Sequence, residues 1–140
     1  MFKRLLLPLD LTTKHDKVVQ TAAGLAKQSG GSVTLLHVIE LIAGLSRDEE
    51  RAFYDRLHKK AQQHLDRIGQ TLAAQKVSWQ AEIQYGHRVQ ETIRYGHEKN
   101  CDLILLTSPT FDPAQPGVGW GSLSYKIGVL SPIPVLLVKA

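Results

Sequence analysis

Hydrophobic residues fall into five short runs, separated by longer stretches with helical spacing. The short runs are apolar, rich in β-branched residues or alternating, which predicts strands at Arg4 to Leu9, Ser32 to Val38, Val77 to Gln84, Leu103 to Thr107 and Ile133 to Val138. The first and fourth runs are almost continuously apolar, as in strands buried on both faces. The third run alternates, which indicates a strand at the edge of a sheet.

The stretches between these runs predict four helices. The first covers Lys14 to Ser29 and stops at Gly30-Gly31, where glycine permits a left-handed cap. The second begins near Ser46, where Glu49 three residues later completes a capping-box pattern. The third covers about Val89 to Lys99, and the fourth begins at about Ser122.

Strands that alternate with helices predict a doubly wound α/β fold, because right-handed crossovers place parallel strands in one sheet with helices on both faces. We expect a single domain over residues 1–140, with a five-stranded parallel sheet, four flanking helices and strand order 3-2-1-4-5. Ligands of such sheets bind beyond the carboxyl ends of the strands, where the strand order reverses. Asp10 and the residues after Thr107 would meet at that point.

The last strand is short, apolar and fenced by Pro132 and Pro134, which predicts the other edge of the sheet. An exposed apolar edge favours pairing with a second copy. The sequence therefore predicts a homodimer joined through Val135, Leu136, Leu137 and Val138.

Composition narrows the possible functions. The 17 basic residues are interleaved with 13 acidic ones and form no aromatic-basic cluster, which argues against a nucleic-acid partner. No apolar run approaches the roughly 20 residues that cross a bilayer, so we expect no membrane span. A single cysteine favours a reducing compartment, hence the cytoplasm. The six histidines show no strong pair at ligand spacing, and we expect no metal site.

Four segments carry a resemblance that covers nearly the whole chain. They are "KRLLLPLDLT", "GGSVTLLHVIE", "GHRVQETIRYGHEKNCDLILLTS" and "GSLSYKIGVLSPIPVLLVK". In their order and spacing they resemble the universal stress protein family. The resemblance implies the Rossmann-like fold of the adenine nucleotide alpha hydrolase type and a dimer formed through the last strand.

Many members of that family bind ATP through a glycine pattern after the fourth strand, and others lack the pattern and do not bind it. Anchored on Gly121 and Ser122, the pattern places Ser108 and Phe111 where its first two glycines belong. Glycine lets backbone amides approach a phosphate, and a phenylalanine ring there would obstruct the nucleotide. The resemblance implies a nucleotide cleft built from Pro8, Leu9, Asp10, Val38, Thr107, Ser108, Gly121, Ser122 and Leu123.

Several of these positions have a structural explanation as well. Serine, as at position 122, is a common helix N-cap residue, and an aspartate at a strand end, such as Asp10, is equally typical of a cap on a helix or a turn. His15 and His87 follow strand ends near the expected cleft, whereas His37 is interpreted as a packing or surface residue.

The leading hypothesis is a dimeric stress-response or regulatory domain that acts through protein interaction or small-ligand sensing, with an impaired nucleotide site and no cofactor. The alternative is a member that binds ATP or another adenine nucleotide, with weak or no hydrolysis. No catalytic residue is assigned, because the chain lacks a G-x-S-x-G elbow, a phosphate-binding P-loop and a G-x-G-x-x-G fingerprint.

Overall fold

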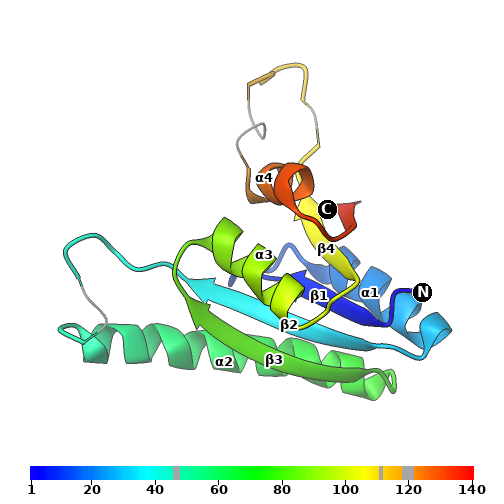
Figure 1. The fold of residues 1–140 in the computed structure, drawn as a ribbon, viewed down its shortest axis with the longest axis horizontal. Helices are drawn as coiled ribbons and strands as arrows, with labels where there is room; N and C mark the ends of the chain where they lie inside the picture. Colours follow the sequence, from blue (N-terminus) through cyan, green and yellow to red (C-terminus); the bar gives the residue numbers. More distant parts are fainter. Residues whose placement is uncertain (46–47, 111, 118–121) are drawn as a thin grey trace.

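A five-stranded parallel sheet with the order β3-β2-β1-β4-β5 forms the centre of the computed structural model, which describes residues 1–45, 48–110, 112–117 and 122–140 (Figure 1). The strands are β1 (Arg4–Pro8), β2 (Ser32–Ile39), β3 (Ser78–Tyr85), β4 (Leu103–Ser108) and β5 (Val135–Lys139). The helices are α1 (Asp16–Ser29), α2 (Arg51–Ala74), α3 (Arg88–Glu98) and α4 (Leu123–Leu130). The predicted fold class and strand order are confirmed.

Two helices begin later than the sequence predicts. In α1 the first helical residue is Asp16 rather than Lys14, because residues 11–15 form bends and turns after β1. In α2 the first helical residue is Arg51, with Glu50 at the N-cap position and no side-chain cap. The capping box expected at Ser46 therefore does not start this helix, and Ser46 itself lies outside the described residues.

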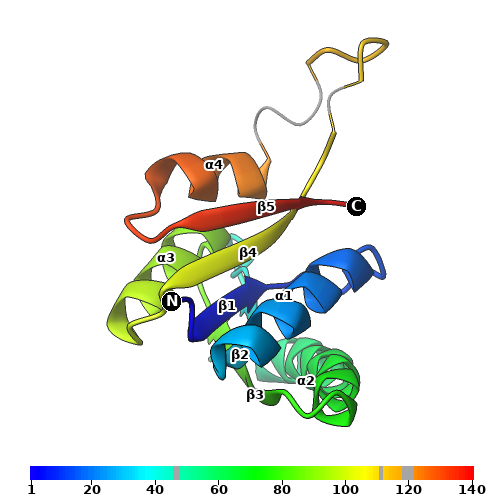
Figure 2. The ribbon, with the colours of Figure 1, turned by 90° about the vertical axis from the view of Figure 1, so that its right-hand side faces the viewer.

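The sheet carries a hydrophobic core on each face. Leu5 and Leu7 of β1 face the core formed with α1 and α2, whereas Leu6 faces the core shared with α3 and α4. Figure 2 shows the two helix pairs on opposite sides of the sheet. All three leucines are 1% exposed or less, so the continuous apolar run of β1 reflects burial on both faces.

The two expected edges are observed. The β3 edge is half-buried and packs against α2, and the β5 edge leaves Leu136 and Leu137 38% and 40% exposed.

The predicted left-handed cap of α1 is also present: Gly30 has φ +72° and its neighbour's amide, Gly31 N, donates to Ala26 O at 3.0 Å. Among the described residues, no helix combines the length and hydrophobicity that crossing a bilayer requires.

Candidate functional site

A cavity of about 350 Å³ lies at the carboxyl ends of the central strands. Its lining comes from the ends of β1, β2 and β4, the turn before α1 and the starts of α3 and α4. The strand order reverses between β1 and β4, because the crossover from β1 leads to β2 on one side and the crossover from β3 leads to β4 on the other. The cavity therefore lies where a doubly wound sheet binds ligands.

The structure gathers the residues that the sequence assigned to the cleft. All of those that it describes line this cavity: Pro8, Leu9, Asp10, Val38, Thr107, Ser108, Ser122 and Leu123. Gly121, the ninth, and Phe111, the expected obstruction, lie outside the described residues. The assignment of these residues to a ligand remains a prediction, while their convergence on one cavity is observed.

Asp10 follows β1 and its carboxylate is held in a fixed orientation. Its Oδ1 atom accepts hydrogen bonds from Thr12 N at 3.0 Å, from Thr12 Oγ1 at 2.6 Å and from His15 Nε2 at 2.7 Å. The Oδ2 atom lies 3.4 Å from Lys14 Nζ. This is the turn-capping arrangement that a strand-end aspartate favours, and it leaves Oδ2 facing the exposed ammonium group.

The hydrogen bonds of Asp10 determine its charge. Partial burial alone would raise the pKa of this carboxyl group, but the donors Thr12 and His15 outweigh it and hold the pKa well below its ordinary value. Asp10 is therefore ionised at neutral pH and accepts hydrogen bonds without donating any.

His15 connects two strand ends that are distant in the sequence. It occupies the N-cap position of α1 but makes no side-chain cap, because both ring nitrogens have other partners. Nε2 bonds to Asp10, and Nδ1 lies 2.8 Å from Thr107 Oγ1 at the end of β4. The expectation that His15 approaches the cleft is correct, whereas His87 is absent from the cavity lining and the adjacent Arg88 contributes instead.

His37 was interpreted from the sequence as a packing or surface residue, yet it lines the cavity. It is buried in β2, and its Nδ1 donates to the carbonyl oxygen of Leu9 at 2.8 Å. Burial lowers the pKa of His37, so the ring is held in its neutral form. Its position directly before Val38, at the end of a buried strand, was the only available signal in the sequence.

Positive charge gathers around the cavity from three elements. Lys14 and Arg88 line it, and Arg88 Nε lies 3.7 Å from Glu40 Oε1. At the end of β5, Lys139 Nζ donates to Ser108 Oγ at 3.1 Å and to Pro109 O at 3.2 Å. The ammonium group of Lys139 thus sits beside the position that the first glycine of the family pattern would occupy.

Ser122 acts as the N-cap of α4. Its Oγ accepts a hydrogen bond from Tyr125 N at 3.2 Å and lies 3.1 Å from Ser124 Oγ. The capping role considered from the sequence is therefore present.

Within the part of the chain that the structure describes, no three His, Cys, Asp or Glu side chains come together as metal ligands would.

Comparison with known proteins places this architecture in one family. The model of the universal stress protein family matches residues 1–139. No curated protein sequence matches the chain. Among solved structures, the hypothetical protein MJ0577 is 21% identical in sequence to this chain and superposes with a TM-score of 0.82. The match covers 100% of this chain and 97% of the MJ0577 chain.

Two further solved structures are complexes with nucleotides. The universal stress protein from Archaeoglobus fulgidus in complex with dAMP shares 12% identity with a TM-score of 0.74, over 99% of this chain and 100% of its own. A universal stress protein in complex with cAMP shares 16% identity with a TM-score of 0.68, over 99% of this chain and 97% of its own. At these identities the likeness establishes the fold.

Proposed function

The chain belongs to the universal stress protein family, and from this premise we propose that it is a regulatory domain whose cleft senses adenine nucleotides through the nucleoside and one phosphate. The polyphosphate part of the cleft is impaired. The main support is the convergence of all the described cleft positions on one cavity at the strand-order reversal.

In our proposal, described residues form the nucleoside half of the cleft. Apolar side chains of Leu9, Leu36 and Leu123 line the cavity beside the polar end formed by Asp10. Cavities of this composition, mostly apolar with few fixed polar groups, suit a purine with its sugar. The solved structures with dAMP and cAMP show that relatives of this fold hold nucleoside monophosphates.

The phosphate half departs from the family pattern. Ser108 stands where the first glycine belongs, and its side chain is engaged by Lys139 Nζ. Phe111 stands where the second glycine belongs. Losing two amide-to-phosphate hydrogen bonds at about 1.5 kcal/mol each weakens binding about a hundredfold. We therefore expect a nucleoside monophosphate to bind about as well as a triphosphate.

The second candidate function is a member that binds ATP. The observation in its favour is the positive charge of Lys14, Arg88 and Lys139 around the cavity, because these cations can hold phosphate oxygens without help from glycine amides.

Calorimetric titration of the purified protein with AMP, ADP and ATP, each with magnesium, separates the two functions. Our proposal predicts dissociation constants for AMP and ATP within about fivefold of each other. ATP binding more than about tenfold tighter than AMP would establish the second candidate instead. The absence of binding by all three nucleotides at millimolar concentration would refute both.

The proposed regulatory unit is a homodimer. Leu136 and Leu137 are exposed on the free side of β5, and Tyr125, Val129 and Leu130 add exposed apolar surface on the adjoining helix α4. Exposed apolar residues at a sheet edge are often covered by a partner. Dimerisation through β5 would cover it and provide a route by which the nucleotide cleft communicates with a protein partner.

A further inference from the structure

Thr107, His15 and Asp10 form a continuous chain of hydrogen bonds at the mouth of the cavity. Thr107 Oγ1 lies 2.8 Å from His15 Nδ1, and His15 Nε2 lies 2.7 Å from Asp10 Oδ1. The three residues come from the end of β4, the turn before α1 and the residues following β1. This is the arrangement of a hydroxyl nucleophile, a base and an acid that orients the base.

The charge of Asp10 determines the direction of each hydrogen bond. Because the ionised carboxylate only accepts hydrogen bonds, Nε2 is the ring nitrogen of His15 that carries the proton when the ring has a single N–H. Nδ1 is then unprotonated and accepts the hydrogen bond from the Thr107 hydroxyl group. In this tautomer the imidazole can remove the proton from Thr107 Oγ1.

Thr12 makes this arrangement rigid. Its amide and its hydroxyl group both donate to Asp10 Oδ1, so the carboxylate cannot rotate away from His15. The side chain of His15 is only 8% exposed, which restricts the ring to the geometry observed. A buried, fully oriented base is what efficient proton transfer requires.

The three residues also share access to a ligand, since each of them lines the cavity of about 350 Å³. Apolar side chains of the cavity lining can contact the acyl chain of an ester. Lys14 lines the same cavity, and its Nζ lies 3.4 Å from Asp10 Oδ2. This ammonium group pairs with the carboxylate that orients His15.

We propose that Thr107 and His15 are catalytic residues, with Asp10 as a positioning residue, in the hydrolysis of small carboxylic esters. This activity is additional to nucleotide sensing and does not depend on it. The sequence does not predict this activity, because it contains no G-x-S-x-G nucleophile elbow.

The reaction proceeds in two balanced steps. In the first, Thr107 Oγ1 attacks the ester carbonyl carbon, its proton passes to His15 Nδ1, and the carbon–oxygen bond to the alcohol breaks as His15 returns that proton to the leaving oxygen. In the second, His15 Nδ1 removes a proton from water and the hydroxide attacks the acyl carbon on Thr107. The bond between this carbon and Oγ1 then breaks, His15 returns the proton to Oγ1, and the acid leaves. No other reactant is needed.

The test uses p-nitrophenyl acetate with the full-length protein. We expect release of p-nitrophenol above the buffer rate, together with acetyl on the Thr107 peptide by mass spectrometry. Thr107→Val removes the hydroxyl group and should lower the rate at least about a hundredfold, whereas Thr107→Ser should retain activity. The control Thr110→Val changes an exposed threonine outside the cavity lining and should leave the rate unchanged.

The role of Asp10 has its own readout. Asp10→Asn should lower the rate and alter its pH dependence, because an amide no longer selects the Nε2–H tautomer of His15. A wild-type rate equal to buffer would overturn the proposal, as would acetylation confined to lysines or equal rates for wild type and Thr107→Val. If Thr107→Val does not fold, two other variants decide. Activity that is retained in Thr107→Ser and lost in a folded His15→Gln variant supports the proposal. Any other pair of results contradicts the proposal.

Discussion

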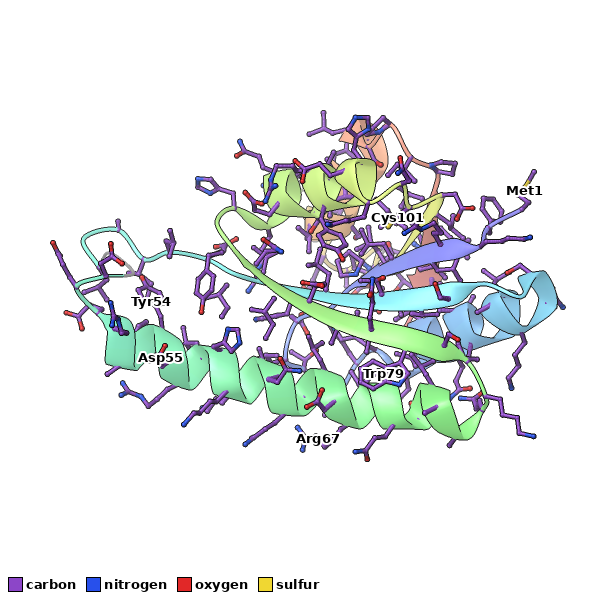
Figure 3. The ribbon with its side chains drawn as sticks, turned by 60° about the horizontal axis from the view of Figure 1, so that its bottom comes forward. Met1, Tyr54, Asp55, Arg67, Trp79 and Cys101 are labelled. Carbon is purple, nitrogen blue, oxygen red and sulfur yellow. The ribbon has the colours of Figure 1, made fainter. Side chains whose placement is uncertain are left out.

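Gly69 of α2 lies directly against the indole ring of Trp79 in β3. A Cβ atom placed on Gly69 would overlap the six-membered part of the ring. Figure 3 shows Trp79 between β3 and the long helix α2, where it fills the space below the sheet. The glycine is therefore needed for close packing of the helix on the edge strand, although it stands inside a helix of 24 residues, where glycine is unfavourable.

We predict that Gly69→Ala destabilises the protein by about 1–3 kcal/mol, the usual effect of overpacking a core. Alanine favours a helix over glycine by about 1 kcal/mol, but the clash with the rigid indole ring exceeds this gain. Urea unfolding followed by circular dichroism measures the difference in the free energy of unfolding. An increase in stability would show that Trp79 can move aside at little cost.

The matched control is Gly24→Ala in α1. A Cβ atom at Gly24 meets no heavy atom within 4 Å, and the residue is exposed. Only the helix propensity changes there, so we expect stabilisation by about 0.5–1 kcal/mol. Opposite signs for the two substitutions would assign the effect at Gly69 to its contact with Trp79.

Replacing Phe111 by glycine tests the proposed impairment of the phosphate site. A glycine at this position restores one element of the family pattern and removes a ring from the expected path of the phosphates. We expect ATP to bind about tenfold more tightly to Phe111→Gly, with AMP affinity changed much less. Calorimetry with both nucleotides measures this ratio. An unchanged ATP affinity would count against steric obstruction by Phe111.

Lys139 is expected to hold a phosphate in place of the missing glycine amides. Because its Nζ lies beside Ser108, Lys139→Met should weaken AMP and ATP binding by about three- to tenfold and leave adenosine binding unchanged. Lys126→Met on the exposed side of α4 serves as the control, since it removes the same charge and leaves the hydrogen bond from Lys139 to Ser108 in place. Equal losses in both variants would indicate a general effect of net charge.

The architecture was predictable from the sequence because its determinants are local. The continuous run of Leu5, Leu6 and Leu7 indicates a strand with a core on each face, and each of these residues is buried as that pattern requires. The prolines before β5 likewise indicate an edge. The cleft positions were identified through the family resemblance, and they meet at one cavity.

The chemistry inside the cavity was not predictable in the same way. His15 and Thr107 are separated by 92 positions, and their hydrogen bond depends on how β1 and β4 are placed side by side. No local pattern records such a pair. The contact between Lys139 and Ser108 could not be predicted from a local pattern either. It depends on the register of β5 against β4, in which these two residues are partners.

The protein should lose stability as the pH falls below about 6.5, the ordinary pKa of histidine. Burial lowers the pKa of His37 and of His64, so the unfolded chain binds protons at pH values where the folded protein does not. The stabilisation present above pH 6.5 is then lost as the pH falls towards the lowered pKa values.

This pH dependence can be assigned by substitution. His37→Gln keeps a donor for the carbonyl group of Leu9 and removes the titrating ring, so it should flatten the decline in unfolding free energy between about pH 7.5 and 5.5. His97→Gln, on the exposed surface of α3, should leave the decline unchanged. Identical curves for wild type and His37→Gln would show that His37 does not contribute.

The proposed dimer makes a prediction about the free edge of the sheet. Leu137→Lys places a charge on β5 where a second copy would pack, and the cost of burying that charge without a partner should shift the protein to monomer at micromolar concentration. Leu41→Lys is the control, because Leu41 is similarly exposed, at 48%, but lies after β2 and away from this edge. Sedimentation equilibrium of both variants and the wild type distinguishes the outcomes. A wild type that sediments as a monomer contradicts the dimer, and a dimer that survives Leu137→Lys places its interface on another surface.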